Sequence, residues 1–152
     1  MVTTEQIKEL RDKTGISIMQ CRKALEEAEG NMDKALEILR AKSGEIAAKK
    51  SDRELGAGLV QAYVHSSGTM GALLELNCET DFVAKNPEFK TLAYDLAMQV
   101  AAAGPETLDD LLAQEFIKDP SMTVTTLLQS FVQKFGEKIA IGKFSRLSVL
   151  NR

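Results

Sequence analysis

Two runs of alternating apolar and polar residues, joined by a turn, limit what this chain can fold into. In the first run, Val60, Ala62 and Val64 alternate with Gln, Tyr and His. In the second run, apolar side chains recur at every second position, as Ala72, Leu74, Leu76 and Cys78. Residues 66–69, Ser-Ser-Gly-Thr, have the composition of a turn. Because successive side chains of a strand point to opposite faces, the sequence predicts an antiparallel hairpin with one apolar face and one solvent-exposed face.

Helical patterns follow the hairpin. Asn86-Pro87 predicts a cap and a first-turn proline, and Gly104-Pro105 predicts the end of that helix. Its expected buried face consists of Phe89, Leu92, Ala93, Leu96 and Val100. A looser acidic segment, 106–121, precedes an amphipathic helix with Leu127, Phe131 and Phe135 in line, and 138–150 has strand composition. We therefore expect an α+β core domain over 58–152, an antiparallel sheet with helices packed on one face.

The N-terminal residues 1–42 contain signals for short helices. The first covers about 4–13, Ser17 and Gln20 fit a capping box for the second, and Asn31 caps the third after a stop at Gly30. Such short helices are marginal alone, so they are expected to form a three-helix module. Residues 43–57 are charged and alanine-rich, which predicts a partly helical linker. Its cations, Lys49, Lys50 and Arg53, are typical of a solvated face rather than a phosphate site.

One methionine in the second helix lies off the expected buried stripe. That stripe consists of Cys21, Ala24, Leu25 and Ala28. Met19 points to the opposite side, beside Arg22, and Ile18 lies at the edge of the stripe. A flexible methionine beside cations suits a partner surface. The spacing alone does not exclude the alternative that Met19 is an isolated exposed apolar residue without a function.

Composition and charge exclude several classes of function. The net charge of −3 does not favour nucleic acid, and no apolar run is long enough for a membrane span. The N-terminus lacks a secretory signal pattern. The two cysteines, Cys21 and Cys78, are far apart and form no metal or redox motif, so both are expected in the core of a reduced, cytoplasmic protein. No spacing predicts a metal or a cofactor.

The segment CETDFVAKN, residues 78–86, does not fit the composition of an ordinary connector. Between a strand and a helix it places an acid and a full-size aromatic, Asp81 and Phe82, where small polar residues are usual. Taken alone, Phe82 would be interpreted as a hydrophobic plug. The single histidine, His65, lies on the wet side of its strand without a nucleophile at a motif spacing, so no enzyme activity is expected.

The residues 9–44, ELRDKTGISIMQCRKALEEAEGNMDKALEILRAKSG, and 74–86, LELNCETDFVAKN, resemble translation elongation factor Ts. That family is the guanine-nucleotide exchange factor for elongation factor Tu, and the resemblance covers essentially the whole chain. It implies a ubiquitin-associated-like fold for the N-terminal module. It also implies that the segment matching Thr80, Asp81, Phe82 and Val83 dislodges magnesium in the GTPase.

The resemblance further implies that the N-terminal module grips the GTPase, through the positions matching Arg11, Ile18, Met19 and Arg22. This is the surface that the off-stripe methionine indicates independently. Residues 16–18 and Gln20 depart from the usual family pattern, so contact details are expected to differ. Longer members have two similar core halves, whereas this chain resembles one. Exposed sheet edges then favour a homodimer, or a 2:2 complex with elongation factor Tu.

Two other functions remain open at this point. The helical module could be a non-catalytic unit that docks a ubiquitin-like or other protein partner. Against this, the loop KTGIS lacks the Met-Gly-aromatic sequence typical of ubiquitin binders. A hydrolase built on Asp81 and His65 would need both groups to meet in one pocket. In the preferred interpretation the chain contacts neither nucleic acid nor membrane directly.

Overall fold

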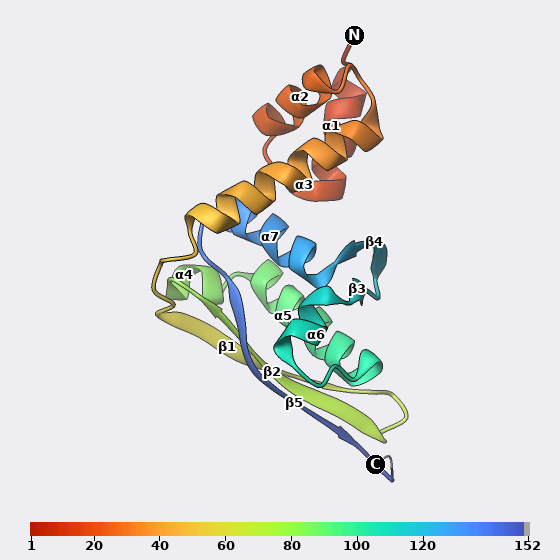
Figure 1. Ribbon diagram of the computed structural model, residues 1–152, viewed down its shortest axis with the longest axis vertical. Coiled ribbons are helices and arrows are strands. Elements are labelled where there is room, and N and C mark those ends of the chain that lie inside the picture. The colour runs from red at the N-terminus through yellow and green to blue at the C-terminus, as the bar shows by residue number, and fades with distance from the viewer. Residues whose placement is uncertain (151–152) are drawn as a thin grey trace. The chain divides into compact units, whose positions relative to one another are not determined.

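The computed structural model describes residues 1–150, which fall into two compact units. One unit comprises residues 1–52 together with 128–136, and the other comprises residues 53–127 together with the chain from 137 onward. Helices alone form the N-terminal part, and a sheet with helices follows (Figure 1). The predicted α+β class is therefore confirmed.

Three helices form the N-terminal part of the first unit. They are α1 (Thr4–Thr14), α2 (Ile18–Glu27) and α3 (Met32–Lys49). Ser17 and Asn31 are N-caps as predicted: the Ser17 hydroxyl accepts from the backbone N–H of Gln20, and Asn31 accepts from that of Lys34. Only this half of the predicted Ser17–Gln20 capping box is formed, because the Gln20 side-chain oxygen accepts from the Gln133 amide at 3.2 Å. Thr3 and Gln6 form a full capping box on α1. The module core is apolar, with Leu10, Cys21, Leu25 and Ala35 completely buried.

Helix α3 continues seven residues into the predicted linker and ends at Lys49. Alanine, glutamate and lysine in this stretch are strong helix formers, so the helix extends without an apolar stripe of its own. The division into a module at 1–42, a linker at 43–57 and a core at 58–152 remains a prediction.

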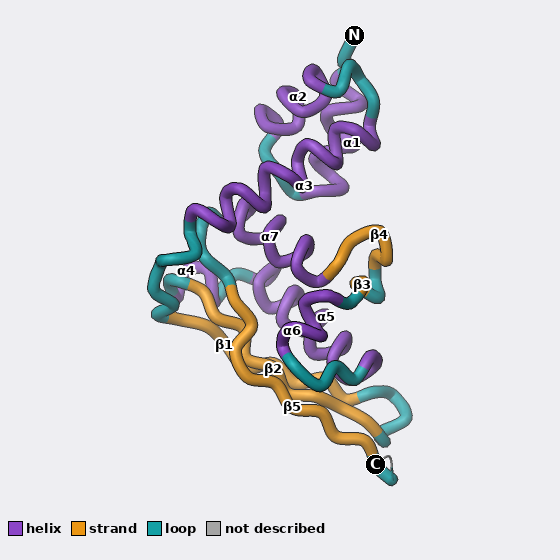
Figure 2. Tube along the Cα trace, in the orientation of Figure 1, coloured by secondary structure: helices purple, strands orange, loops and turns teal. Residues whose placement is uncertain are grey.

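An antiparallel three-stranded sheet forms the base of the second unit. Its strands β1 (Ala57–Val64), β2 (Met70–Cys78) and β5 (Ala140–Ser148) lie in the order β1-β2-β5. In the register, Leu74 pairs with Gln61 on one side and with Phe144 on the other. Helix α5 (Pro87–Ala103) packs along one face of this sheet (Figure 2). All five residues of its predicted buried face are buried.

The predicted facing of β1 is wrong. Val60, Ala62 and Val64 lie on the exposed side of the sheet, whereas Leu59, Gln61 and Tyr63 are half-buried. The pairing register decides this, because the inward Leu74 opposes Gln61 and places the odd-numbered residues of β1 toward α5. Tyr63 accordingly meets Tyr94 of α5 edge to face, with ring centroids 5.5 Å apart. The outer face of the sheet is therefore partly apolar.

The acidic segment after α5 is more ordered than its composition suggests. It contains α6 (Leu108–Ala113) and a small hairpin of β3 (Glu115–Phe116) and β4 (Asp119–Thr123). The buried amide of Gln99 fixes this hairpin, because it donates to the Glu115 carbonyl and accepts from the Ile117 N–H at 2.9 Å. In α7 (Val124–Phe135) the deeply buried residues include Val124 and Val132, whereas the aromatic side chains Phe131 and Phe135 are only half-buried.

Candidate functional site

The segment after β2 forms a single capped turn of helix, α4 (Asp81–Ala84). Thr80 is its N-cap, and the Thr80 hydroxyl accepts from the backbone N–H of Val83 at 3.5 Å. The turn closes when the N–H of Lys85 donates to the Asp81 carbonyl at 3.0 Å. Asn86 then caps α5, accepting from the Glu88 N–H at 2.8 Å. Two consecutive caps thus set where α4 and α5 begin.

The two faces of α4 differ sharply in burial. Val83 is 4% exposed and Ala84 is also buried, so these two side chains attach the turn to the core. Phe82 is 84% exposed, and its neighbour Asp81 is exposed as well. A hydrophobic plug would be buried, so the structure contradicts the plug interpretation of Phe82. Within this turn, the large aromatic ring of Phe82 is therefore exposed to solvent beside the carboxylate of Asp81.

Two glutamates connect the start of α4 to the segment that leads into β5. The Glu137 carboxylate accepts from the backbone N–H groups of Glu79 and Thr80, each at 3.1 Å, and from the Thr80 hydroxyl at 2.6 Å. In the opposite direction, the Glu79 carboxylate accepts from the Lys138 N–H at 2.6 Å and pairs with Arg53 at 3.4 Å. Glu137 lies 57 residues from Thr80, and no local motif in the sequence indicates this contact.

Cys78 lies directly beneath this segment. Its buried thiol donates to the Thr80 carbonyl at 3.2 Å. Burial raises the pKa of Cys78, and the negative charges of Glu137 and Asp81 raise it further. Cys21 is likewise free and buried, and burial raises its pKa. Both thiols therefore remain protonated, and their prediction as small core residues is confirmed.

The second predicted set of site residues lies on α1 and α2. Met19 is 68% exposed and Ile18 48% exposed, while Arg22 is exposed on the same helix. The side chain of Arg11 is 41% exposed and pairs with Asp12 at 3.3 Å. An exposed pair of this kind is weak, so the guanidinium can exchange partners at little cost. The predicted stripe on α2 is buried as expected, and Met19 lies outside it.

The structure does not bring Asp81 and His65 together. Asp81 follows the end of β2 that pairs with the start of β1, and His65 follows the other end of β1. The ring of His65 contacts the Tyr63 hydroxyl at 3.1 Å. Within residues 1–150, no group of three or more His, Cys, Asp or Glu side chains is placed to hold a metal. In the same range, no helix has the length and apolar character that a membrane span requires.

Comparison with known proteins decides the family. The sequence model described as Elongation factor TS matches residues 79–152. Elongation factor Ts of Carboxydothermus hydrogenoformans is 41% identical, over 98% of this chain and 89% of the relative. The chain belongs to the elongation factor Ts family. The Desulfitobacterium hafniense elongation factor Ts is 40% identical over 95% of this chain and 88% of its own length.

Members of the elongation factor Ts family differ in length around the shared region. The Clostridium kluyveri elongation factor Ts is 44% identical over 98% of this chain, but the match covers 49% of that protein. The chain therefore spans about half the length of this relative. The match to the Carboxydothermus hydrogenoformans protein extends over 194 positions, so that relative carries additional residues within the matched region. Family membership assigns this chain to the elongation factors of protein biosynthesis.

Proposed function

We propose that this chain is a guanine-nucleotide exchange factor that binds elongation factor Tu with GDP and promotes release of the nucleotide. The exposed Phe82 on a capped turn is the observation that carries the proposal. The chain acts by binding and catalyses no covalent chemistry, so it is not an enzyme in that sense. In this proposal the chain acts in translation elongation in the cytoplasm.

The intruding group in this mechanism is the side chain of Phe82. A fixed aromatic presents a large contact area at little entropic cost, because few rotatable bonds must be frozen. Inserted beside the magnesium and phosphate site of the GTPase, Phe82 displaces the elements that position the metal, and Asp81 adds a negative charge. Thr80 and Val83 hold the turn, one as its cap and the other in the core.

Release follows from the coupling between the two binding equilibria. If the factor weakens GDP binding by a given ratio, GDP weakens binding of the factor by the same ratio. Each tenfold weakening requires about 1.4 kcal/mol of contact energy between the two proteins. In the proposal, the surface of Arg11, Ile18, Met19 and Arg22 supplies part of this energy without contacting the nucleotide.

Release of a fluorescent GDP analogue tests the proposal. Elongation factor Tu loaded with the analogue is mixed with excess unlabelled GDP and a substoichiometric amount of this chain. Faster release at that ratio, with each molecule of the factor acting repeatedly, is expected. If release stays at the spontaneous rate while the chain binds a ubiquitin-like protein, the docking-module alternative replaces the proposal.

Replacing Met19 by alanine is expected to weaken the complex with elongation factor Tu and to leave the fold intact. Met19 is 68% exposed, and exposed substitutions usually change stability by less than about 0.5 kcal/mol. Titration by calorimetry should show weaker binding, and a thermal melt should be unchanged. Glu37→Ala, at an exposed position of α3, is the matched control. Unchanged affinity for Met19→Ala would remove this surface from the proposed interface.

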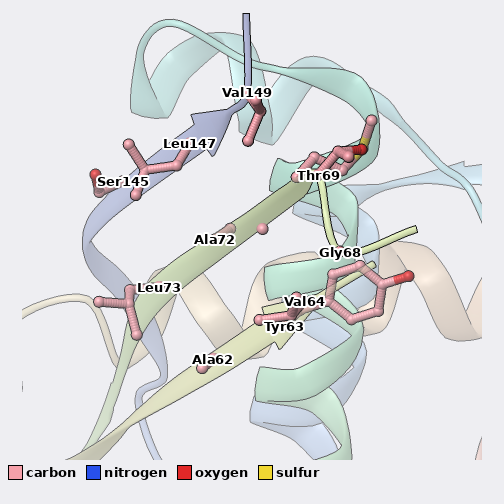
Figure 3. A pocket seen from close by; sticks show the side chains of 12 residues that line it. Ala62, Tyr63, Val64, Gly68, Thr69, Ala72, Leu73, Ser145, Leu147 and Val149 are labelled. Atoms are coloured by element: carbon pink, nitrogen blue, oxygen red, sulfur yellow. The ribbon is translucent and has the colours of Figure 1, made fainter. Parts of the chain in front are cut away.

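The outer face of the sheet supports a homodimer, or a 2:2 complex with the GTPase. Val60, Val64 and Leu73 are each more than half exposed there, and Leu147 is 79% exposed. Figure 3 shows an open hollow on this face, with Leu73, Leu147 and Val149 along it. A second copy that buries this face would remove apolar surface from water. In a two-fold dimer the same patch serves both copies.

A lysine at Leu73 is expected to dissociate this dimer. The substitution places a charge in the middle strand of the patch, where a second copy would have to desolvate it. Light scattering should give twice the chain mass for the parent at micromolar concentration and the monomer mass for Leu73→Lys. Ile117→Lys, at a 46% exposed position near the β3–β4 hairpin, should behave like the parent. A strictly monomeric parent, alone and with the GTPase, contradicts the proposal.

A further inference from the structure

The pose of Phe82 has to be fixed from outside its own helix. Helix α4 has four residues, and a helix of that length is not stable alone. Phe82 is 84% exposed, so its own ring contributes little packing. Val83 and Ala84 anchor the turn from below. The remaining freedom lies at its N-terminal side, where the chain leaves the sheet.

Strand pairing in the sheet does not fix the segment that precedes α4. The pairing between β2 and β5 ends at Asn77 opposite Ala140, and the pairing with β1 ends at Cys78 opposite Ala57. The backbone N–H groups of Glu79 and Thr80 therefore have no acceptor in a strand ladder. Glu79 is half-buried, and a backbone N–H there that lacks an acceptor is costly, so this group needs another partner. Thr80 is exposed, so water is the alternative partner of its N–H.

Glu137 supplies that partner. Its Oε1 atom accepts both N–H groups at 3.1 Å, and its Oε2 atom accepts the Thr80 hydroxyl at 2.6 Å. Because the Thr80 hydroxyl donates its proton to Glu137, its lone pairs are free to accept the Val83 N–H, the capping bond of α4. The Glu137 carboxylate thus fixes both the backbone before α4 and the orientation of the Thr80 hydroxyl that caps this helix.

A reciprocal contact fixes Glu137 in turn. The Glu79 carboxylate accepts the N–H of Lys138 at 2.6 Å, and its side chain is only 18% exposed. Arg53 approaches the same carboxylate at 3.4 Å. Residues 79–80 and 137–138 are therefore joined in both directions by charge-assisted hydrogen bonds, which are stronger than neutral ones.

We propose that Glu137 is a positioning residue for nucleotide exchange, holding Thr80 so that α4 presents Phe82 in a single pose. The inference rests on the proposed exchange function. Glu137 contacts neither nucleotide nor magnesium in this account, and acts through Thr80. Loss of this anchor lets α4 pivot on Val83 and Ala84, so that Phe82 samples several directions. Small displacements of a group that must meet its target in one geometry reduce rates steeply.

Amide hydrogen exchange of the free chain tests the anchor without reference to function. In Glu137→Ala, the amides of Glu79 and Thr80 should exchange about tenfold faster or more, because they lose their acceptor. Glu137→Gln retains a side-chain carbonyl that accepts both amides, so its exchange should stay close to that of the parent. Glu106→Ala removes an exposed glutamate elsewhere in the unit and should change neither amide. Unchanged protection in Glu137→Ala overturns the inference.

Nucleotide release then separates positioning from general stability. Glu137→Ala should bind nucleotide-free elongation factor Tu within about twofold of the parent, yet accelerate GDP release about tenfold less, with Glu137→Gln restoring most of the rate. A merely structural residue would behave differently: binding and GDP release would both fall in proportion to the lost stability, and Glu137→Gln would not rescue them. That result overturns the inference. If Glu137→Ala does not fold, the test rests on Glu137→Gln. That variant has to retain both the protection of the two amides and the activity in GDP release, and loss of either overturns the inference. If the parent itself fails to accelerate release, the proposed function fails, whatever the amide result.

Discussion

Replacing Phe82 by alanine is expected to abolish most of the acceleration of GDP release while the chain remains folded and still binds elongation factor Tu. The ring is 84% exposed, so its removal creates no cavity and should change stability by less than about 0.5 kcal/mol. The surface around Met19 and Arg11 is untouched. If the ring supplies the contact that displaces the metal-holding elements, release should slow at least about tenfold, the equivalent of 1.4 kcal/mol.

Binding and release must be measured on the same variant. Calorimetry with nucleotide-free elongation factor Tu should give an affinity for Phe82→Ala close to that of the parent. Asp81→Ala should give a milder slowing of release, because it removes a charge but little volume. Equal losses of affinity and of release rate would assign Phe82 to the gripping surface rather than to the site of action.

Replacing Phe89 by alanine, seven residues further on, is expected to have the opposite effect: it should lower the stability of the fold strongly. Phe89 is completely buried in the first turn of α5, the helix that packs on the sheet. Truncation of a buried phenylalanine typically costs about 3–5 kcal/mol, because the loss of apolar burial is added to the cost of a cavity. That amount is a large share of the total stability of a domain of this size, about 5–15 kcal/mol.

Denaturant unfolding measures this effect directly. The midpoint for Phe89→Ala should fall strongly with an unchanged slope, and GDP release should be lost only in proportion to the unfolded fraction. Phe89→Leu, which fills most of the volume, should recover much of the loss. A loss under about 1 kcal/mol for Phe89→Ala would contradict the description of the core beneath α5.

Most of the architecture follows from local pattern. The caps at Ser17, Asn31 and Asn86 begin their helices as the sequence indicates, and Gly104 ends α5 in a left-handed conformation with φ of 57°. Side-chain alternation predicts the buried face of β2 correctly, because Leu74, Leu76 and Cys78 are all apolar and recur at every second position. These signals are short-range, so a single sequence contains them.

The remaining features depend on partners distant in the chain. The sequence alone predicts the wrong facing for β1, because Tyr63 suits either face and only the pairing with β2 selects one. The sequence also leaves open whether Phe82 is buried, since a lone aromatic residue in a connector fits a hydrophobic plug as well as a contact residue. Glu137 gives no local signal, and its hydrogen bonds to Glu79 and Thr80 form only where the chain before β5 meets the end of β2.

The magnesium dependence of GDP release tests the central claim most directly. Stopped-flow release of a fluorescent GDP from elongation factor Tu should be compared for the parent and Phe82→Ala, with magnesium present and after chelation. The account predicts a large defect of Phe82→Ala in magnesium that shrinks when the metal is chelated, because the barrier lowered by Phe82 is then already absent. An equal defect under both conditions would contradict the metal-linked mechanism.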